Sequence, residues 1–397
     1  MKSVYFKLFI FLGALAISHH SVGQSATVYT SIKEALKNKK DVQYLDLSGQ
    51  ELRKVPRKIK KFKNLKHLDL SENLITKMPG FLTKMKHLEK LNLNTNKLSE
   101  VHKKLYKLKN LEILELSNNK FTVVPEQIFQ LKQLKEIWFR NNKLTEIPDN
   151  FGNTPKLTLI DFSGNQISKI PASIGSLQTL YYLRFANNRL SSLPNEVCNI
   201  TTLIEIKISQ NQIIKLPDNF GNLRQLREIE ANDNLLTYLP ANFGDIYQLS
   251  SLQLNKNKIS ELPKSFPKLR QLQHLELEGN KFTAIPKELF SIFAISYLDL
   301  SYNEISEIPS EIAKLNKLNY LDLRGNNISI VPKEIGKIRF MSKLWLGDNS
   351  LKSLPSEIKE LKWLEILSLY NNQFDQKNKE LIQEWLKDND PKCSITF

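Results

Sequence analysis

The sequence predicts an elongated α/β solenoid, in which one short structural unit is stacked many times. Three observations predict it. Residues 42–374 repeat with a period of 23 residues and without an insertion or deletion. One position of the repeat is almost always Asn, and another is almost always Pro. Each repeat also contains an x-apolar-x-apolar-x stretch, which is typical of a strand with one buried face.

The repeat divides the chain into fifteen units, and the last unit is cut short after Phe374. Each unit follows LxxLxLxxNxLxxLPxxIxxLxx, with apolar residues at positions 1, 4, 6, 11, 14, 18 and 21. Because no unit could bury its apolar face alone, neighbouring units must stack into one continuous core. One elongated domain is therefore expected, where 397 residues alone would suggest two or three. The units begin at Val42, Leu65, Leu88, Leu111, Leu134, Leu157, Leu180, Leu203, Leu226, Leu249, Leu272, Ile295, Leu318, Met341 and Leu364.

The Asn column at position 9 predicts a hydrogen-bonded ladder. A buried amide carries both donors and an acceptor, so it can satisfy backbone groups of its own unit and of a neighbour. Gln50 takes this position in the first unit. The column contains Asn73, Asn96, Asn119, Asn142, Asn165, Asn188, Asn211, Asn234, Asn257, Asn280, Asn303, Asn326, Asn349 and Asn372.

The Pro column at position 15 runs from Pro56 to Pro355, and His102 is its single departure. Proline fixes φ and lacks a backbone N–H. We therefore expect it where the chain turns from the inner strand into an outer, convex segment.

Residues 1–23 have the pattern of a secretory signal peptide. Lys2 and Lys7 form a basic start, Leu8–Ile17 is apolar, and small residues follow at Ser21 and Gly23, so cleavage is expected before Gln24. Ten apolar residues are too few to span a bilayer, which requires about 20. The sequence thus predicts a secreted, periplasmic or cell-surface protein without a transmembrane segment.

Both ends of the repeat are expected to be capped. Residues 24–41 form the N-terminal cap, in which Ser31 and Glu34 make a capping box that opens a helix through about Asn38. Residues 375–397 form the C-terminal cap, with a helix over 377–388 and a closing strand over 393–397. The two cysteines, Cys198 and Cys393, are about eight strand spacings apart, so we expect free thiols.

These motifs resemble the leucine-rich repeat family, in its 23-residue LPxxI/FxxL type. That type occurs in bacterial extracellular proteins and in scaffold proteins of the Shoc-2 and plant Ras-group kind. The resemblance covers residues 42–374 and implies a right-handed horseshoe with a short parallel strand per unit on its concave side.

The sequence contains no motif for catalysis. It has no phosphate-binding glycine loop, no metal-spaced Cys/His cluster and no nucleophile elbow. We therefore predict a non-enzymatic protein without a cofactor, a catalytic residue or a metal site.

Positions 3, 5, 7 and 8 are expected to point outward from the concave sheet. They carry fifteen acidic and seven basic residues, a net charge of −8, although the whole chain carries +16. Two groups of aromatic and charged residues stand out there. The first aromatic cluster contains Trp138, Arg140, Asp161, Tyr182 and Arg184. The second aromatic cluster contains Tyr297, Asp299, Tyr302, Tyr320, Asp322, Arg324, Trp345 and Tyr370.

Tyr, Trp and Arg dominate protein-binding hot spots, so the leading hypothesis is a recognition or adhesion protein that binds a protein partner in its concave face. The alternative for these aromatics is structural, because strands favour such residues. If the signal is not used, an intracellular signalling scaffold is the alternative.

A second hypothesis is polyanion binding by the first units. Residues 53–109 contain 17 Lys and Arg against 4 Asp and Glu. Such a patch attracts anionic glycans or lipids, or else it only keeps a convex face solvated. Nucleic acid is disfavoured, because the chain contains no module that reads it. The candidate residues are Arg57, Lys58, Lys60, Lys61, Lys103, Lys104 and Lys107.

Overall fold

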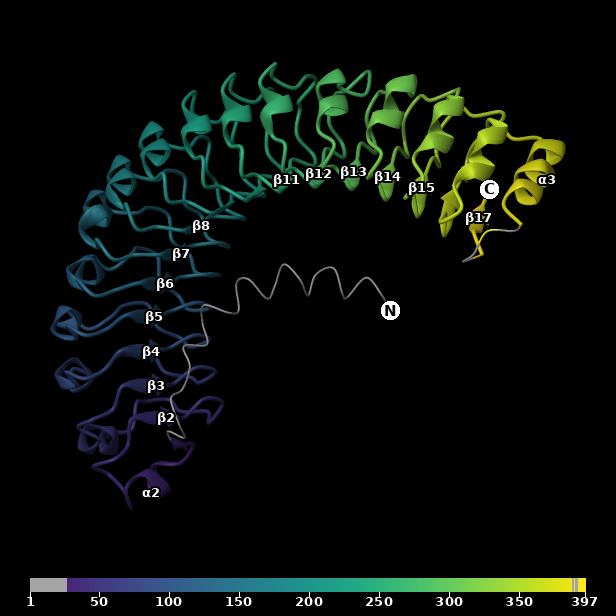
Figure 1. Ribbon diagram of the computed structural model, residues 1–397. Helices are drawn as coiled ribbons and strands as arrows, with labels where there is room; N and C mark the ends of the chain where they lie inside the picture. The colour runs from purple at the N-terminus through teal and green to yellow at the C-terminus, as the bar shows by residue number, and fades with distance from the viewer. Residues whose placement is uncertain (1–26, 388, 390–391) are drawn as a thin grey trace.

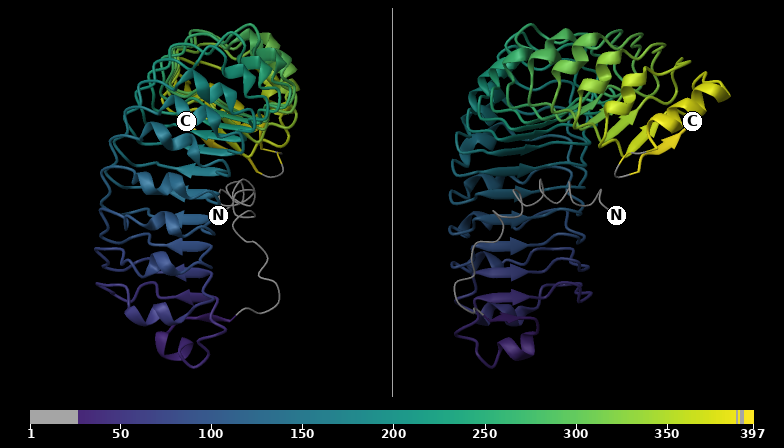
Figure 2. Two further views of the ribbon diagram at one scale, coloured as in Figure 1. Left: turned by 90° about the vertical axis from the view of Figure 1, so that its left-hand side faces the viewer. Right: turned by 45° about the vertical axis from the view of Figure 1, so that its right-hand side comes forward.

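The computed structural model of the protein describes residues 27–387, 389 and 392–397. The predicted signal segment, residues 1–23, lies outside the described residues. The described chain forms one curved solenoid, with strands on the inner, concave side of the arc and short helical turns on the outer, convex side (Figure 1). The N-terminal arm is a straight stack of units, and the C-terminal part curves away from it (Figure 2).

The described residues form one parallel sheet of seventeen strands, in which each strand pairs with the next along the chain. The predicted parallel solenoid is confirmed. Equivalent positions of neighbouring units are partners, as with Leu298 and Leu321. The strands are β1 (Val28–Tyr29), β2 (Tyr44–Asp46), β3 (His67–Asp69), β4 (Lys90–Asn92), β5 (Ile113–Glu115), β6 (Glu136–Trp138), β7 (Leu159–Asp161), β8 (Tyr182–Arg184), β9 (Glu205–Lys207), β10 (Glu228–Glu230), β11 (Ser251–Gln253), β12 (His274–Glu276), β13 (Tyr297–Asp299), β14 (Tyr320–Asp322), β15 (Lys343–Trp345), β16 (Ile366–Ser368) and β17 (Ser394–Thr396).

The convex side consists of one short 3₁₀ turn per unit. In most units the proline stands just before this turn, and its carbonyl accepts the first hydrogen bond, as Pro56 accepts from the Ile59 N–H at 3.1 Å. The turns are η1 (Arg57–Lys61), η2 (Leu82–Lys84), η3 (Leu105–Lys107), η4 (Glu126–Gln130), η5 (Asp149–Asn153), η6 (Ala172–Ser176), η7 (Asn195–Asn199), η8 (Phe220–Asn222), η9 (Phe243–Asp245), η10 (Phe266–Lys268), η11 (Lys287–Ser291), η12 (Ser310–Lys314), η13 (Lys333–Lys337) and η14 (Ser356–Glu360).

The core lies between the sheet and these turns. The Leu and Ile side chains at positions 1, 4, 6 and 11 form continuous buried columns through the solenoid. Phe residues extend these columns, with Phe121 edge-on to Phe139 at 5.2 Å and Phe220 stacked on Phe243 at 6.2 Å between ring centroids. Burying each such side chain contributes about 1.5–3 kcal/mol. Because every unit contributes to the same columns, stability depends on contacts between neighbours.

The Asn side chains at position 9 lie inside the solenoid and bond to its backbone. Asn96 is typical: its Nδ2 donates to the carbonyls of Leu93 and Asn94 in its own unit and of Leu70 in the preceding unit. Its Oδ1 accepts from the Ile75 N–H at 2.9 Å. All fourteen residues from Asn73 to Asn372 repeat this pattern. Each amide therefore joins two neighbouring units.

Additional elements cover both ends of the solenoid. At the N-terminal end, β1 pairs with β2, and α2 (Ile32–Ala35) follows the Ser31 side chain, which accepts from the Glu34 N–H. The helix ends at Ala35, earlier than the predicted Asn38, and turns follow it. At the C-terminal end, α3 (Gln376–Trp385) packs near η14, and β17 pairs with β16. The strand β1 was not anticipated from the sequence.

Candidate partner-binding surface

The concave face is narrower than the sequence pattern predicts. Strands β2–β16 cover only positions 3–5 of each unit, so positions 3 and 5 present the outward side chains. Position 8 instead lies in a tight turn, where φ is positive in all fifteen units, from +52° at Asn141 to +71° at Gly164. Residues at position 8, including Tyr302 of the second aromatic cluster, therefore stand on a turn beside the sheet.

This turn has a signal that the sequence reading missed. Left-handed backbone favours Gly, and then Asn and Asp. Ten of the fifteen residues at position 8 are of these types, namely Gly49, Asn118, Asn141, Gly164, Asn187, Asp233, Gly279, Gly325, Asp348 and Asn371.

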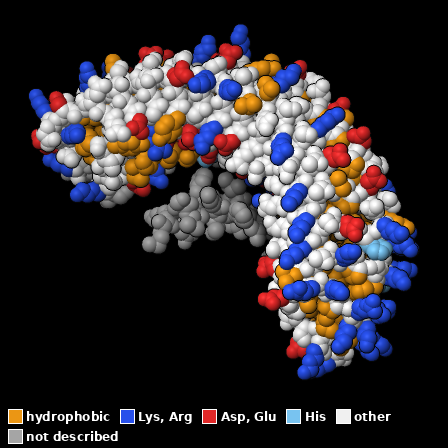
Figure 3. Space-filling model, turned by 180° about the vertical axis from the view of Figure 1, so that it is seen from behind, with side chains coloured by type: hydrophobic (Ala, Val, Ile, Leu, Met, Phe, Trp, Pro, Cys, Tyr) orange, Lys and Arg blue, Asp and Glu red, His pale blue; other side chains and the backbone are white. Residues whose placement is uncertain are grey.

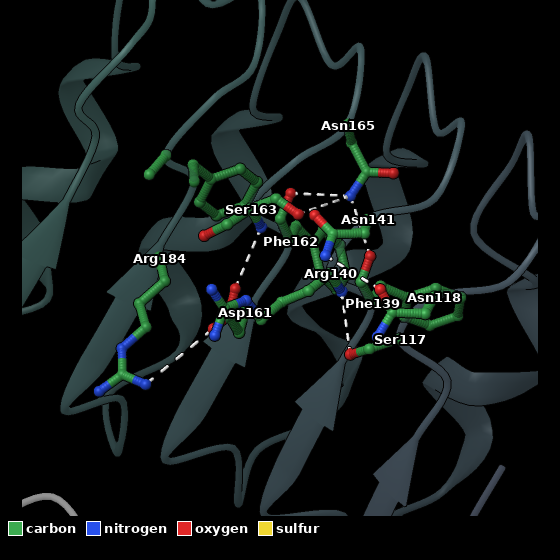
Figure 4. A network of polar contacts seen from close by, with 12 residues as sticks. Ser117, Asn118, Phe139, Arg140, Asn141, Asp161, Phe162, Ser163, Asn165 and Arg184 are labelled. Carbon is green, nitrogen blue, oxygen red and sulfur yellow. Dashed lines mark hydrogen bonds and ion pairs between the residues drawn. The ribbon is translucent and has the colours of Figure 1, made fainter. Parts of the chain in front are cut away.

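The first aromatic cluster lies on β6, β7 and β8 and is held by charge pairs (Figure 4). Asp161 is buried, and its Oδ1 accepts from the Ser163 N–H at 3.1 Å. Its Oδ2 lies 3.7 Å from Arg140 Nε and 4.0 Å from Arg184 Nη1. Burial raises the pKa of Asp161, while the Ser163 hydrogen bond and the arginines oppose this shift. Asp161 thus orients the two arginines from below the surface.

The charge network continues onto strands that the predicted cluster did not include. Arg184 Nε donates to Glu205 at 2.6 Å. Lys207 Nζ contacts Glu205 at 3.5 Å, Glu228 at 2.9 Å and Glu230 at 2.6 Å. Burial acts to lower the pKa of Lys207, but the three carboxylates outweigh it and raise that pKa overall. Most charges on this part of the face are therefore neutralised within the protein.

Aromatic rings of the first cluster surround Arg184. Its guanidinium carbon lies 5.9 Å from the Trp138 ring centroid and 5.6 Å from that of Tyr182. Trp138 Nε1 donates to Glu136 at 3.1 Å. The structure thus brings Trp138, Tyr182 and Arg184 together, and the polar groups of Trp138 and Arg184 bond to carboxylates of the protein itself.

The second aromatic cluster centres on a column of stacked rings at position 3. The rings of His274 and Tyr297 lie 4.1 Å apart, and those of Tyr297 and Tyr320 are also 4.1 Å apart and nearly parallel, at 7°. Burial and then the neighbouring Tyr320 raise the pKa of Tyr297, so its hydroxyl stays protonated. His274 was not assigned to this cluster from the sequence, because its contact with Tyr297 depends on register between units.

Beside this column, Asp322 fixes the position of Arg324. Asp322 is fully buried, and both its oxygens accept from Arg324 Nε, at 2.9 and 3.0 Å. The Tyr320 hydroxyl donates to the same carboxylate at 3.2 Å. The Arg324 guanidinium then lies over the Trp345 ring, 4.8 Å from its centroid. These contacts hold an arginine and a tryptophan in a fixed pair on the surface.

Asp299 lies opposite Asp322 in the sheet and is also buried. Its Oδ1 accepts from the Ser301 N–H at 2.9 Å and from the Ser301 hydroxyl at 2.6 Å. Burial, and then the carboxylate of Asp322, raise the pKa of Asp299 to about 6. Asp299 therefore lies beneath the surface of the cluster, where it bonds to Ser301.

Two glycines leave room for the rings of the remaining tyrosines of the cluster, Tyr302 and Tyr370. A Cβ at Gly347 would lie 2.5 Å from the Tyr370 ring, and one at Gly325 would lie 2.4 Å from the Tyr302 ring. Both rings thus rest on glycine backbone. Trp345 Nε1 is buried and has no hydrogen-bond partner among the described residues. The cluster presents half-buried rings and one oriented arginine.

The basic residues of the polyanion hypothesis lie apart, on the convex side. Arg57, Lys58, Lys60 and Lys61 belong to η1, Lys103 and Lys104 precede η3, and Lys107 belongs to η3. All seven are exposed. Lys and Arg side chains crowd this end of the molecule (Figure 3).

The other expectations concern metals, thiols and membranes. Among the described residues, no group of His, Cys, Asp and Glu is arranged to hold a metal ion. Cys198 and Cys393 are free and buried, and burial raises the pKa of both thiols to about 11. No helix in the described part of the chain is long and apolar enough to cross a bilayer.

Comparison with known proteins places these features in a family. A leucine rich repeat family model matches residues 40–98, 109–167 and 239–282, and a leucine-rich repeat region model matches residues 286–388. A solved leucine-rich repeat protein of Leptospira interrogans is 32% identical, with a TM-score of 0.85, over 94% of this chain and 100% of that chain. None of the curated proteins matches.

Two further solved structures have the same fold. The plant peptide hormone receptor RGFR1, in complex with RGF2, is 28% identical with a TM-score of 0.71, over 83% of this chain and 59% of that chain. An internalin of Listeria monocytogenes is 21% identical with a TM-score of 0.69, over 82% of this chain and 91% of that chain.

Proposed function

Because the chain belongs to the leucine-rich repeat family, whose solenoids commonly serve as protein-binding scaffolds, we propose that it is a secreted, non-catalytic recognition protein. Its protein partner binds in the concave face at the second aromatic cluster. Adhesion to another cell or surface is the form of recognition that suits an exported solenoid.

The arrangement of that cluster supports the proposal. The repeat requires apolar residues only at the buried positions, so positions 3 and 5 are free to vary. Elsewhere these positions mostly carry charged or small polar residues. On β13–β15 they carry Tyr297, Tyr320 and Trp345, all of them half-buried; Tyr297 and Tyr320 are partners in the sheet, and Trp345 lies opposite Asp322 on the next strand. Packing of the solenoid does not account for this clustering, whereas a contact surface does.

The side chains of the second aromatic cluster are also held in place before a partner binds. Asp322 holds Arg324, and Arg324 covers Trp345, so little side-chain entropy remains to be lost when a partner binds. The first aromatic cluster is a weaker candidate, because it carries only two aromatic rings, Trp138 and Tyr182, on strands that are not adjacent.

A relative supports the choice of a protein partner. RGFR1, which is 28% identical to this chain, was solved in complex with RGF2. This likeness supports recognition through the solenoid and leaves the partner of this chain open.

Affinity capture with defined variants tests the proposal. We expect Trp345→Ala and Tyr320→Ala each to weaken capture of the partner from secreted and surface proteins of the producing organism at least tenfold. Tyr238→Ala is the matched control, because Tyr238 is exposed and lies outside the strands of the concave sheet. Equal loss of capture and of thermal stability in the Trp345 variant would show that the cluster is structural.

Sequencing the N-terminus of the mature protein tests the secretion part. We expect a start at Gln24 in the exported fraction. A protein that retains Met1 and stays in the cytoplasm would instead support the intracellular scaffold.

A further inference from the structure

A long groove runs along one flank of the N-terminal arm, where each unit passes from its strand to its outer turn. Its first part, of about 820 Å³, is lined by positions 12–17 of the first two units and by Lys60. Its second part, of about 950 Å³, is lined by positions 12–17 of the second to fifth units. Lys77 lines both parts, so the two hollows adjoin each other along this flank.

The floor of the groove is apolar and its rim is charged. Val55, Met78, Val101, Val124 and Ile147 lie along the floor. Val123 also lines it and is 49% exposed, although it is aliphatic. In the view from behind, hydrophobic side chains form a band along this arm among Lys and Arg (Figure 3).

The charges on the rim are segregated along the groove. The charged residues that line the first part are all basic, namely Arg53, Lys54, Arg57, Lys60 and Lys77. The far end is acidic, with Glu126, Glu146 and Asp149, and Glu100 and Lys103 lie between. The groove is thus positive at one end and negative at the other.

These charges differ from those on the concave face in being unpaired. Among the described residues, none of these ten side chains forms an ion pair. On the concave face, in contrast, Arg184, Lys207 and Arg324 are each paired with carboxylates. An unpaired charge beside an apolar floor is available to a ligand.

The middle of the groove contains the one departure from the Pro column. The ring of His102 replaces proline there and lies over Gly80, where a Cβ would be 2.7 Å from its Nε2. His102 Nδ1 accepts from the Lys104 N–H at 3.2 Å. The His102 ring thus occupies the space beside Gly80 where the two hollows meet. On the same flank, the eleventh and twelfth units enclose only about 250 Å³.

We propose that this groove is a second binding site, separate from the concave face, for an extended polypeptide segment of a partner. The segment carries acidic residues over the first two units, apolar residues over Val101 and Val123, and basic residues over the fourth and fifth units. Five units at a strand spacing of about 4.8 Å accommodate about six to eight extended residues.

Charge complementarity selects a polypeptide over the other candidates. Nucleic acids and sulfated glycans carry one sign of charge along their whole length, so the acidic end would repel them. A second copy of the chain would have to place a protruding segment in the hollow, whereas this flank is hollow in both copies. Only a polypeptide carries acidic, apolar and basic groups in sequence along one chain.

Selection from a displayed library of random dodecapeptides tests the site on the full-length protein. We expect enriched peptides to carry acids at one end and bases at the other. In fluorescence anisotropy, Val123→Asp should weaken their binding at least tenfold. Ile330→Asp is the matched control, because Ile330 occupies the same repeat position, is 70% exposed and lies outside the groove. Its binding should stay within twofold of that of the wild type.

Exchanging charges between the groove and the peptide then determines the direction in which the peptide binds. Lys54→Glu combined with Lys77→Glu should weaken binding at least tenfold, and replacing the acids of the peptide by lysines should restore it. Four outcomes would overturn the proposal: no enrichment, enriched peptides without charge segregation, full binding by the Val123 variant, or uniformly acidic peptides that heparin displaces. The last outcome would assign the flank to polyanions.

Discussion

At the scale of the residue, one asparagine amide completes the backbone of two neighbouring units. Asn188 Nδ2 donates to the carbonyls of Phe162, Phe185 and Ala186, and its Oδ1 accepts from the Ile167 N–H. The bonds to Phe162, Phe185 and Ile167 are buried, so water does not readily replace the amide when it is removed. A buried backbone group that loses its partner costs about 1–3 kcal/mol.

We therefore predict that Asn188→Ala lowers the free energy of unfolding by about 3 kcal/mol or more, because several backbone groups lose their partner together. Chemical denaturation measures this change. Asn195→Ala is the control, since Asn195 is exposed at the first position of η7. It should change stability by less than about 0.5 kcal/mol. Similar effects of both substitutions would contradict the role of the ladder.

The pair of buried carboxylates makes stability depend on pH. The pKa of Asp299 is raised to about 6, above its ordinary value of 3.8, so the folded state holds this proton more tightly than the unfolded chain. The contribution of Asp299 is therefore most favourable at low pH and is lost as the pH rises through about 4 to 6. Its full size is at most about 3 kcal/mol.

Asp299→Asn should remove this dependence, because an amide keeps the acceptor for Ser301 and carries no charge. We expect the wild type to lose stability relative to the variant when the pH rises from 5 to 7.5. Denaturation midpoints at the two pH values measure the difference. A parallel pH dependence of both proteins would show that Asp299 does not titrate in this range.

At the scale of the element, the caps protect the two open ends of the sheet. The helix α3 places Ile382, which is fully buried, against the last units, and β17 covers the edge of β16. An uncovered edge would offer free N–H and C=O groups to other chains. Because each unit contacts only its neighbours, damage to a cap should remain local.

Ile382→Ala should cost about 2–5 kcal/mol locally, by leaving a cavity under α3. We predict faster amide hydrogen exchange in β15–β17 and unchanged exchange in β3–β8. Leu381→Ala serves as the control, because Leu381 is 41% exposed on the same helix. Faster exchange along the whole sheet would show that the solenoid unfolds as a single unit.

At the scale of the whole molecule, the uniform unit length keeps every strand, turn and amide in phase. Removing residues 249–271 deletes one complete unit and joins equivalent positions. We expect this variant to stay soluble and folded, with nearly the same circular dichroism per residue. Removing 249–270 shifts every later Asn by one position, so we expect loss of cooperative unfolding. Equal folding of both would contradict a strict phase.

The sequence was sufficient to predict the fold because one period places every buried residue. Leu298 and Asn303, for example, lie where their columns place them. The surface is harder to predict. The stacking of His274 on Tyr297 and the burial of Asp322 depend on side-chain directions between units. The sequence showed His102 as a departure from the Pro column, but the hollow along that flank depends on how side chains of successive units pack.

The direction of the Asn bonds has a consequence for synthesis. Each amide reaches back to the preceding unit, as Asn73 reaches Leu47 O and receives the Leu52 N–H. A unit leaving the ribosome is therefore incomplete until the Asn of the next unit has emerged, 26 residues after the carbonyl that it serves. A chain that becomes available from its N-terminus therefore completes each unit only when the next unit has followed.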